Sequence, residues 1–298
     1  MILSRRLVAY LGLGCLALVA PALATAGCGE DLGSTSVVDR LRTIAIRADK
    51  PEAAPGTSVH LEALVIDPRA GTRDLDSAWF ICVTDPGETA QTCASANLTA
   101  APVLCAVQPE AKICLASVDA SADYVLPERA LTGRPAGDAG QVIVTHIVGP
   151  KDTLMACAES FSSDGKASGE CQITIKRLTV SRSTTPNQNP IISNLRFDGQ
   201  ALDTITVAPE SKDHMLTAVV DPSSTETLPA PRNGATTESL FVAWYTSPAG
   251  DIAVARTEPP KTETKYQAPG GQGPVKLIAV VHDDRGGVSW VQGSIRVQ

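Results

Sequence analysis

Basic residues are few in this 298-residue sequence and never form a run. Lys and Arg number 25 against 32 Asp and Glu, which makes the formal net charge −7. Proteins that bind nucleic acid gather Lys and Arg in a patch or stripe, because many of their contacts go to phosphate. The sequence shows no such segment, and we expect no nucleic acid among the partners.

Recognisable catalytic and cofactor motifs are also missing. The sequence contains no G-x-S-x-G, H-E-x-x-H, phosphate-binding P-loop or G-x-G-x-x-G pattern. The four histidines are far apart and adjoin no cysteine or serine constellation; they are His60, His146, His214 and His282. We expect no cofactor and no enzyme activity. A site assembled only by folding stays open as a distant alternative.

Patterns that bind a metal ion are absent as well. The cysteines show neither a C-x2-C nor a C-x4-C spacing, so a zinc site is not expected. Asp283 and Asp284 in "DDRGG" could offer oxygen ligands to calcium, which needs six to eight. Aspartate and glycine are also the residues that a turn between strands uses. We favour the turn and predict no metal site.

No apolar run is long enough to form a typical transmembrane helix. The longest spans residues 7–20, against the roughly 20 residues that a bilayer requires. Arg5 and Arg6 precede it and small residues follow it, which is the pattern of a secretory signal peptide over residues 1–27. Cleavage would remove two basic residues and no acidic one, changing the net charge from −7 to −9.

Cys28 has two interpretations. Ala24-Thr25-Ala26 fits an ordinary cleavage site, which would leave Gly27 at the new terminus. Ala26-Gly27-Cys28 instead resembles the end of a bacterial lipobox, although Thr25 stands where leucine is usual. The small, polar residues that follow suit a flexible tether over 28–40. We favour lipidation of Cys28, which predicts an exported lipoprotein anchored to the outer membrane, on its periplasmic face or at the cell surface.

Six cysteines remain after Cys15 and Cys28 are set aside. An even number in an exported chain predicts disulfides, and six cysteines allow 15 pairings. We predict that sequence neighbours pair, each bond closing a short excursion: Cys82 with Cys93, Cys105 with Cys114, and Cys157 with Cys171.

Alternating apolar residues predict short strands along most of the chain. In "SVHLEALVIDP" one face holds the apolar residues Val59, Leu61, Ala63 and Val65. In "RTIAIRAD", Arg47 lies opposite Ile44 and Ile46. The best candidate for a helical turn is "ADYVLPERAL", where Pro127 suits only a first turn. Many short strands separated by turn signals are typical of a β-sandwich.

Four segments recur in the same order in the two halves of the chain. They are "IRADK" with "LRFDG", "VIDP" with "VVDP", "SAWF" with "VAWY", and the closing segments 154–175 with 275–297. We therefore predict an all-β protein of two immunoglobulin-like β-sandwich domains. The first spans 41–180 and carries a disulfide-rich insertion, a polar linker follows over 181–190, and the second domain spans 191–298.

The three tryptophans receive different predictions. Trp79 and Trp244 occupy matching places in the two halves, which favours burial in the core, as for the tryptophan on strand C of immunoglobulin folds. Trp290 has no counterpart in the first half and follows the "DDRGG" turn. It packs on the sheet or, if it faces outward, stacks against a ligand.

Three stretches carry a resemblance to a known group. They are "VVDRLRTIAIRADKPEAAPGTSVHLEALVIDP", "SLFVAWYTSPAG" and "GPVKLIAVVHDDRGGVSW". Together they resemble uncharacterised lipoproteins from myxobacterial genomes, and the resemblance spans most of the mature chain. It implies an exported, anchored, immunoglobulin-like protein and brings no activity or catalytic residue with it. Thr25 departs from the lipobox of that group.

These observations favour a non-catalytic binding or structural module of the cell envelope. Its partners would be the membrane, through the lipid anchor, and an envelope protein or polysaccharide. The alternative is a carbohydrate-binding or adhesion module that uses Trp290 and neighbouring loops.

Overall fold

The computed structural model describes residues 35–69, 71, 73–89, 93, 103–164, 170–202, 205–232 and 234–298. The predicted signal peptide, Cys28 and the first part of the predicted tether lie outside these residues. None of the helices in the described residues has the length and apolar character needed to cross a membrane.

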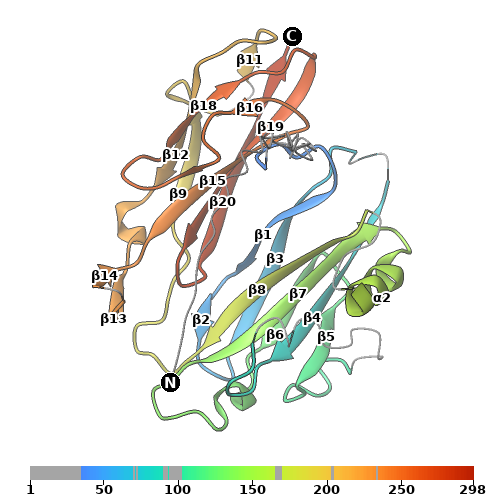
Figure 1. Cartoon of the computed structure of the whole chain (residues 1–298), viewed down its shortest axis with the longest axis vertical. Coiled ribbons are helices and arrows are strands. Elements are labelled where there is room, and N and C mark those ends of the chain that lie inside the picture. The colour runs from blue at the N-terminus through green and yellow to red at the C-terminus, as the bar shows by residue number, and fades with distance from the viewer. Residues whose placement is uncertain are drawn as a thin grey trace, which may run out of the picture. The chain divides into compact units, whose positions relative to one another are not determined.

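The first half of the chain forms two facing sheets, which we call the first sandwich (Figure 1). One sheet has the order β1-β3-β6 and the other β2-β8-β7-β4-β5. The strands are β1 (Arg42–Ala48), β2 (Glu52–Ala53), β3 (Ser58–Ile66), β4 (Leu75–Val83), β5 (Ile113–Ser117), β6 (Ser121–Val125), β7 (Gly140–Pro150) and β8 (Gln172–Val180). The helices are the 3-10 helix η1 (Glu128–Leu131) and α2 (Leu154–Asp164).

The second half repeats this arrangement in two sheets that we call the second sandwich. Their orders are β10-β9-β12-β18-β16 and β11-β20-β19-β15-β17. The strands are β9 (Ile192–Phe197), β10 (Gln200–Ala201), β11 (Ile205–Val207), β12 (His214–Val220), β15 (Leu240–Ser247), β16 (Asp251–Ile252), β17 (Arg256–Thr257), β18 (Glu263–Gln267), β19 (Gly273–Asp283) and β20 (Val288–Val297). The 3-10 helix η2 (Pro222–Ser224) and a hairpin of β13 (Thr227–Arg232) and β14 (Ala235–Thr237) lie between β12 and β15.

Strand order identifies both halves as immunoglobulin-like. The pairings β1-β3-β6 and β9-β12-β18 match strands A, B and E of that fold, and β4-β7-β8 and β15-β19-β20 match C, F and G. In each half a short strand pairs in parallel with the last strand, β2 with β8 and β11 with β20. The prediction of an all-β protein with two immunoglobulin-like sandwiches is confirmed.

The repeat extends to single hydrogen bonds. Asp49, after β1, accepts a bond from the backbone N–H of His60 through Oδ1 at 2.8 Å. Asp198, after β9, accepts one from the N–H of Met215 through Oδ1 at 2.7 Å. Both aspartates also donate their own backbone N–H to the same partner residue. Equivalent pairs of hydrogen bonds thus link the ends of the first two long strands in each sandwich.

Trp79 and Trp244 lie at the centres of the two sandwich cores, as predicted. Their exposed fractions are 0% and 1%, and they stand on the equivalent strands β4 and β15. Each indole N–H has a partner: Trp79 donates to the carbonyl of Asp119 and Trp244 to Oγ1 of Thr257, both at 2.9 Å. Burial therefore leaves neither indole N–H without a hydrogen-bond partner.

The closing segments of the two halves do not match as predicted. The counterpart of the hairpin β19–β20 is β7 with β8, and the predicted partner segment begins instead with helix α2. The helix lies in the connection between β7 and β8, in contact with β7 and β4 (Figure 1). Leu154, Cys157 and Ala158 pack inward there at the i, i+3, i+4 spacing of a helix rather than the alternation of a strand. The helical turn expected near Pro127 is present as η1, with Pro127 just before it.

The structure pairs the six cysteines as sequence neighbours, as predicted. Bonds join Cys82 with Cys93, Cys105 with Cys114, and Cys157 with Cys171. The third bond ties α2 to the start of β8. Disulfides of this kind in an all-β protein fit an exported chain.

A third apolar cluster, the junction core, joins the outer faces of the two sandwiches. Its fully buried members are Val38, Ala45, Leu64, Ile66, Ile278, Val280 and Val288. On β3 the inward residues Val59 and Leu61 alternate as predicted, but Leu64 and Ile66 are buried on the opposite face. Burial of one such side chain contributes about 1.5–3 kcal/mol. The described residues accordingly form one compact unit.

The prediction of a flexible tether to residue 40 is wrong for Ser36, Val37 and Val38. Val37 pairs in parallel with Thr246 of β15, and Thr246 donates its N–H to the carbonyl of Ser36 at 2.9 Å. Ser36 and Val38 are each 1% exposed. The part of β15 beyond its pairing with β17, together with the junction core, holds these residues in place.

Candidate functional site

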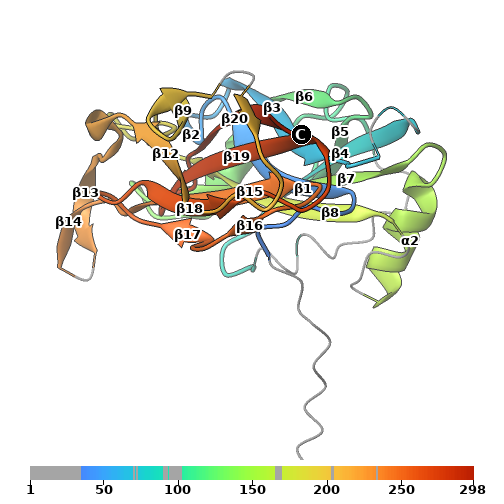
Figure 2. The same cartoon turned by 90° about the horizontal axis from the view of Figure 1, so that it is seen from above.

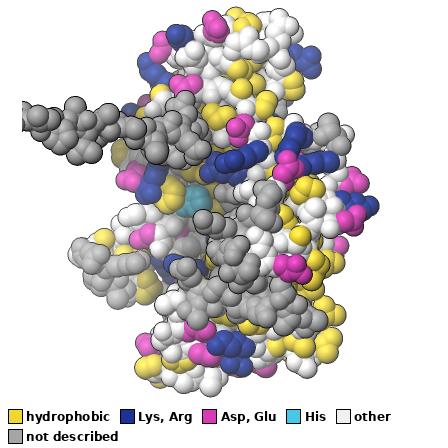
Figure 3. All heavy atoms as spheres, turned by 45° about the vertical axis from the view of Figure 1, so that its right-hand side comes forward, with side chains coloured by type: hydrophobic (Ala, Val, Ile, Leu, Met, Phe, Trp, Pro, Cys, Tyr) yellow, Lys and Arg dark blue, Asp and Glu magenta, His cyan; other side chains and the backbone are white. Residues whose placement is uncertain are grey.

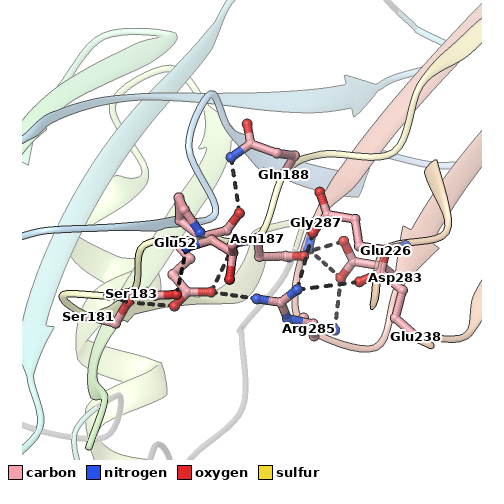
Figure 4. A network of polar contacts seen from close by, with 12 residues as sticks. Glu52, Ser181, Ser183, Asn187, Gln188, Glu226, Glu238, Asp283, Arg285 and Gly287 are labelled. Carbon is pink, nitrogen blue, oxygen red and sulfur yellow. Dashed lines mark hydrogen bonds and ion pairs between the residues drawn. The ribbon is translucent and has the colours of Figure 1, made fainter. Parts of the chain in front are cut away.

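A polar network joins the two sandwiches around Arg285, in the turn between β19 and β20. The guanidinium contacts Glu52 of β2 at 2.8 Å and Glu226, before β13, at 3.1 Å. A carboxylate oxygen of Glu238 lies 4.0 Å away. The Arg285 side chain is only 14% exposed, and Figure 4 shows it between Glu52 and Glu226. Such partly desolvated pairs hold their geometry more firmly than surface pairs.

The segment 181–190, predicted as a polar linker, is pinned to both sandwiches. Asn187 is fully buried, and its backbone N–H donates to Oε2 of Glu52 at 2.9 Å. Its side-chain amide donates to Oδ2 of Asp283 at 3.1 Å. Ser181 donates to the other oxygen of Glu52 at 2.5 Å. The linker and the Arg285 network thus share Glu52 as a common acceptor (Figure 4).

Asp283 and Asp284 are not brought together as a cation site. Oδ1 of Asp283 accepts the backbone N–H groups of Arg285 and Gly287 at 2.8 and 2.7 Å. A side chain at Gly287 would collide with Asp283 and with the carbonyl of Gln188, so the turn needs glycine there. Asp284 is exposed and lies 3.4 Å from the N–H of Ser239. The "DDRGG" segment therefore has the role of a turn.

Burial shifts the pKa of three ionisable groups around this network. It raises the pKa of Glu238 to about 7. It lowers the pKa of Lys176 to about 8, although the negative charge of Asp283 acts to raise it. It also lowers the pKa of His282 to about 4, with a further contribution from the charges of Lys176 and Arg256. Lys176 also donates to the carbonyl of Gly286 across the junction. Within the described residues, no group of three or more His, Cys, Asp or Glu side chains could hold a metal ion.

An open hollow of about 420 Å³ lies at the edge of the junction, beside Trp290. The first sandwich lines it with Arg47, Asp49 and Glu62, from β1, the turn after it and β3. Residues 189–192, from the linker and the start of β9, form another side. Ser289 and Trp290 of β20 complete it. The hollow therefore exists only while the two sandwiches are held together.

Trp290 is half-buried and lies beneath a charged side chain. The Arg47 guanidinium is 4.6 Å from the centroid of its indole ring, a cation–π geometry. Glu62 accepts from Nε of Arg47 at 2.5 Å and so holds the guanidinium in that position. Trp290 also packs against the junction core. Trp290 thus packs on the sheet and also lines the hollow, and its stacking against a ligand stays a prediction.

The remaining polar groups of the hollow differ in what they can offer a ligand. The Asn189 side chain is occupied, since it donates to the carbonyl of Ala48 at 2.7 Å and accepts from the N–H of Val288 at 2.9 Å. Asp49 uses Oδ1 for a backbone bond, while Oδ2 lies 3.3 Å from Nζ of exposed Lys50. The Asp49 and Glu62 side chains are 45% and 37% exposed. Two carboxylates and one guanidinium therefore face the opening.

The four histidines do not assemble into a site. His60 contacts Asp123 at 2.8 Å and His214 contacts Asp198 at 2.8 Å, while His282 stacks on Phe241. His146 is fully buried, with its ring centroid 4.2 Å from that of Trp79 and no hydrogen-bond partner for either ring nitrogen. Burial lowers the pKa of His146 to about 4, so the ring is neutral at pH 7.

Sequence reasoning found Trp290 but missed the residues around it. The alternation in "RTIAIRAD" already placed Arg47 on the face away from Ile46. Nothing in the sequence indicated that this outer face meets β20. In the space-filling view, acidic and basic side chains lie next to one another on the face that Figure 3 shows.

No protein-family model and no curated protein matches the chain. Similar solved structures include a nucleoside hydrolase-related hypothetical protein from Saccharophagus degradans associated with carbohydrate metabolism, at 14% identity, 38% of this chain, 26% of that chain and a TM-score of 0.27. This chain thus spans about a quarter of that protein.

Two further solved structures align over more of the chain. The D0–D1 domain of intimin is 13% identical over 85% of this chain and 98% of that chain, with a TM-score of 0.23. The three N-terminal domains of the outer capsid protein Hoc of bacteriophage RB49 are 11% identical over 87% and 70%, with a TM-score of 0.22. With TM-scores this low, the immunoglobulin-like assignment rests on the strand order.

Proposed function

We propose that this chain is an exported, lipid-anchored, non-catalytic binding module of the cell envelope. Three disulfides in an all-β fold support export. The signal-like segment 1–27 and the lipobox-like Ala26-Gly27-Cys28 support anchoring. The resemblance to myxobacterial lipoproteins points the same way.

The observation that carries the binding role is the hollow beside Trp290. It is open, and half-exposed aromatic and charged side chains line it. Strands and a pinned linker position those side chains, so a ligand would meet a preformed surface rather than one it must first order.

Anchoring is tested by expressing the whole precursor in a bacterial host fed with labelled palmitate. The proposal expects label on the wild-type protein and none on Cys28→Ser, with the mature chain starting at a modified Cys28. Mass spectrometry of the mature terminus reads this directly. A wild-type chain that begins at unmodified Gly27 would contradict the anchor.

Binding is tested with the mature Cys28→Ser protein and washed envelope fractions from the source organism. The exposed hollow residue Ile191 is changed to Asp, and Arg256→Ala serves as the matched control. Arg256 also forms a cation–π pair, 3.8 Å from the centroid of Phe241, but lies outside the hollow. The proposal expects Ile191→Asp to reduce envelope binding and Arg256→Ala to leave it unchanged. Equal binding by all three proteins would contradict it.

A further inference from the structure

We propose that the hollow beside Trp290 binds an uncharged saccharide of the cell envelope. The inference rests on the proposed binding function and names the ligand class for that site. It follows from the apolar surface, the polar groups and the charge balance of the hollow, and each is argued in turn.

The apolar part of the hollow suits the C–H face of a sugar ring. Arg47 covers one face of the Trp290 ring, so Pro190 and Ile191 supply most of the apolar lining, and 53% of the Ile191 surface is exposed. An isoleucine this exposed beside a half-exposed indole gives a ligand apolar area to cover. A sugar has such a face, and its edge carries hydroxyl groups that need partners.

The polar groups fit those hydroxyl groups. Glu62 and Asp49 present carboxylate oxygens, which accept hydrogen bonds from hydroxyls, and their side chains are 37% and 45% exposed. The Arg47 guanidinium has more N–H donors than its bonds to Glu62 use. A ligand that both donates and accepts along one edge satisfies all three groups, as a polyol does.

The charges around the hollow favour an uncharged ligand. Arg47 pairs with Glu62, and Lys50 lies beside Asp49, so the acidic and basic groups balance. An anion would meet two carboxylates and would have to draw Arg47 away from Glu62. A cation would compete with Arg47 and Lys50 for the same carboxylates. An uncharged saccharide leaves both pairs intact.

The size and openness of the hollow fit a short segment of a polymer. A volume of about 420 Å³ lies at the small end of the roughly 300–1,000 Å³ of ligand pockets. An open hollow between strands lets a chain continue past it on either side. We therefore expect oligosaccharides to bind better than the corresponding single sugars.

The test is calorimetric titration of the mature Cys28→Ser protein with uncharged hexasaccharides of glucose, xylose, mannose and N-acetylglucosamine. Hexagalacturonic acid and hexameric glucosamine are the charged comparisons. We expect at least one uncharged probe to bind and both charged probes to bind more weakly. Binding of the charged probes alone would overturn the proposal.

Variants locate the binding. Ile191→Asp and Glu62→Gln should weaken it about tenfold or more, equivalent to about 1.4 kcal/mol, and Trp290→Phe should weaken it less. Arg256→Ala is the control and should bind as wild type does. Circular dichroism confirms that each variant folds. Equal losses in Arg256→Ala and Ile191→Asp would overturn the assignment of the hollow.

A second assay covers a saccharide that the probes do not represent. Envelope fractions are treated with periodate, which destroys sugars with adjacent hydroxyls, or with protease. Hollow-dependent binding that is lost to periodate and survives protease supports a saccharide. The reverse result overturns the saccharide but keeps the binding module. If no envelope binding depends on the hollow and no probe binds, both proposals fail.

Discussion

The guanidinium of Arg47 lies 4.6 Å from the ring centroid of Trp290, and the two residues belong to different sandwiches. The pair closes the junction at one edge, as the Arg285 network does elsewhere. It also lines the hollow. Stability of the junction and shape of the candidate site are therefore linked through the same side chains.

A double-mutant cycle should measure that link. We expect Arg47→Ala, Trp290→Leu and the double variant to show a coupling free energy of about 0.5–2 kcal/mol, since a partly desolvated cation–π pair contributes in that range and leucine has no π face. Urea unfolding at pH 7 gives the free energies. The same cycle on Arg256 and Phe241 provides a comparison within the second sandwich. Strict additivity at Arg47 and Trp290 would mean that the contact contributes no stability.

Replacing Arg285 should destabilise the protein more than replacing an exposed arginine. Arg285→Met leaves the carboxylates of Glu52 and Glu226 without their shared partner, and Glu52 is only 9% exposed. Removing one member of such a pair costs about 3 kcal/mol or more. Arg256→Met, whose side chain is 58% exposed, should cost under about 1 kcal/mol. Similar urea midpoints for the two variants would contradict this role for Arg285.

The buried histidine should make the protein sensitive to acid. The pKa of His146 is lowered to about 4, whereas an unfolded histidine titrates near 6.5. Between these pH values the unfolded chain takes up a proton at this histidine and the folded protein does not. The free energy of unfolding is therefore highest above pH 6.5 and falls as the pH drops toward 4. The loss from this group is at most about 3 kcal/mol.

His146→Phe should flatten the pH dependence of the melting temperature between pH 6.5 and 4. The change keeps an aromatic ring against Trp79 and removes two unpaired nitrogens. His60→Phe is the control, because His60 is an exposed histidine that contacts Asp123 at the surface. An unchanged pH profile in His146→Phe would show that His146 takes up its proton over the same pH range in the folded and the unfolded chain, which would contradict this prediction.

Glu238 should make the protein less stable as the pH rises, whereas His146 makes it less stable as the pH falls. Burial raises its pKa from 4.5 to about 7, so its contribution is present below pH 4.5 and is lost as the pH rises through 7. Glu238→Gln should match wild type at pH 4 and exceed its free energy of unfolding by about 1–3 kcal/mol at pH 8. Urea titrations at both values test this. A constant difference across the two would contradict the cause.

The strands and the repeat could be predicted because they depend on local pattern. Alternation places Val59 and Leu61 inward whatever the rest of the chain does, and the aspartates after β1 and β9 accept equivalent backbone hydrogen bonds in both halves. Neighbour pairing of the cysteines follows from short excursions between strands. Helix α2 escaped prediction because its segment was aligned by its order in the chain with the β19–β20 hairpin of the second half.

The sequence by itself determined the all-β class, the two immunoglobulin-like copies and the burial of Trp79 and Trp244. Only the tertiary structure decided that Leu64 and Ile66 are buried on the outer face of β3, that Val38 joins them, and that Arg47 meets Trp290. The physical reason is the sequence distance between the residues that specify each face of a strand. A strand's inner face is specified by neighbours two residues away, whereas its outer face depends on whichever surface the folded chain brings against it.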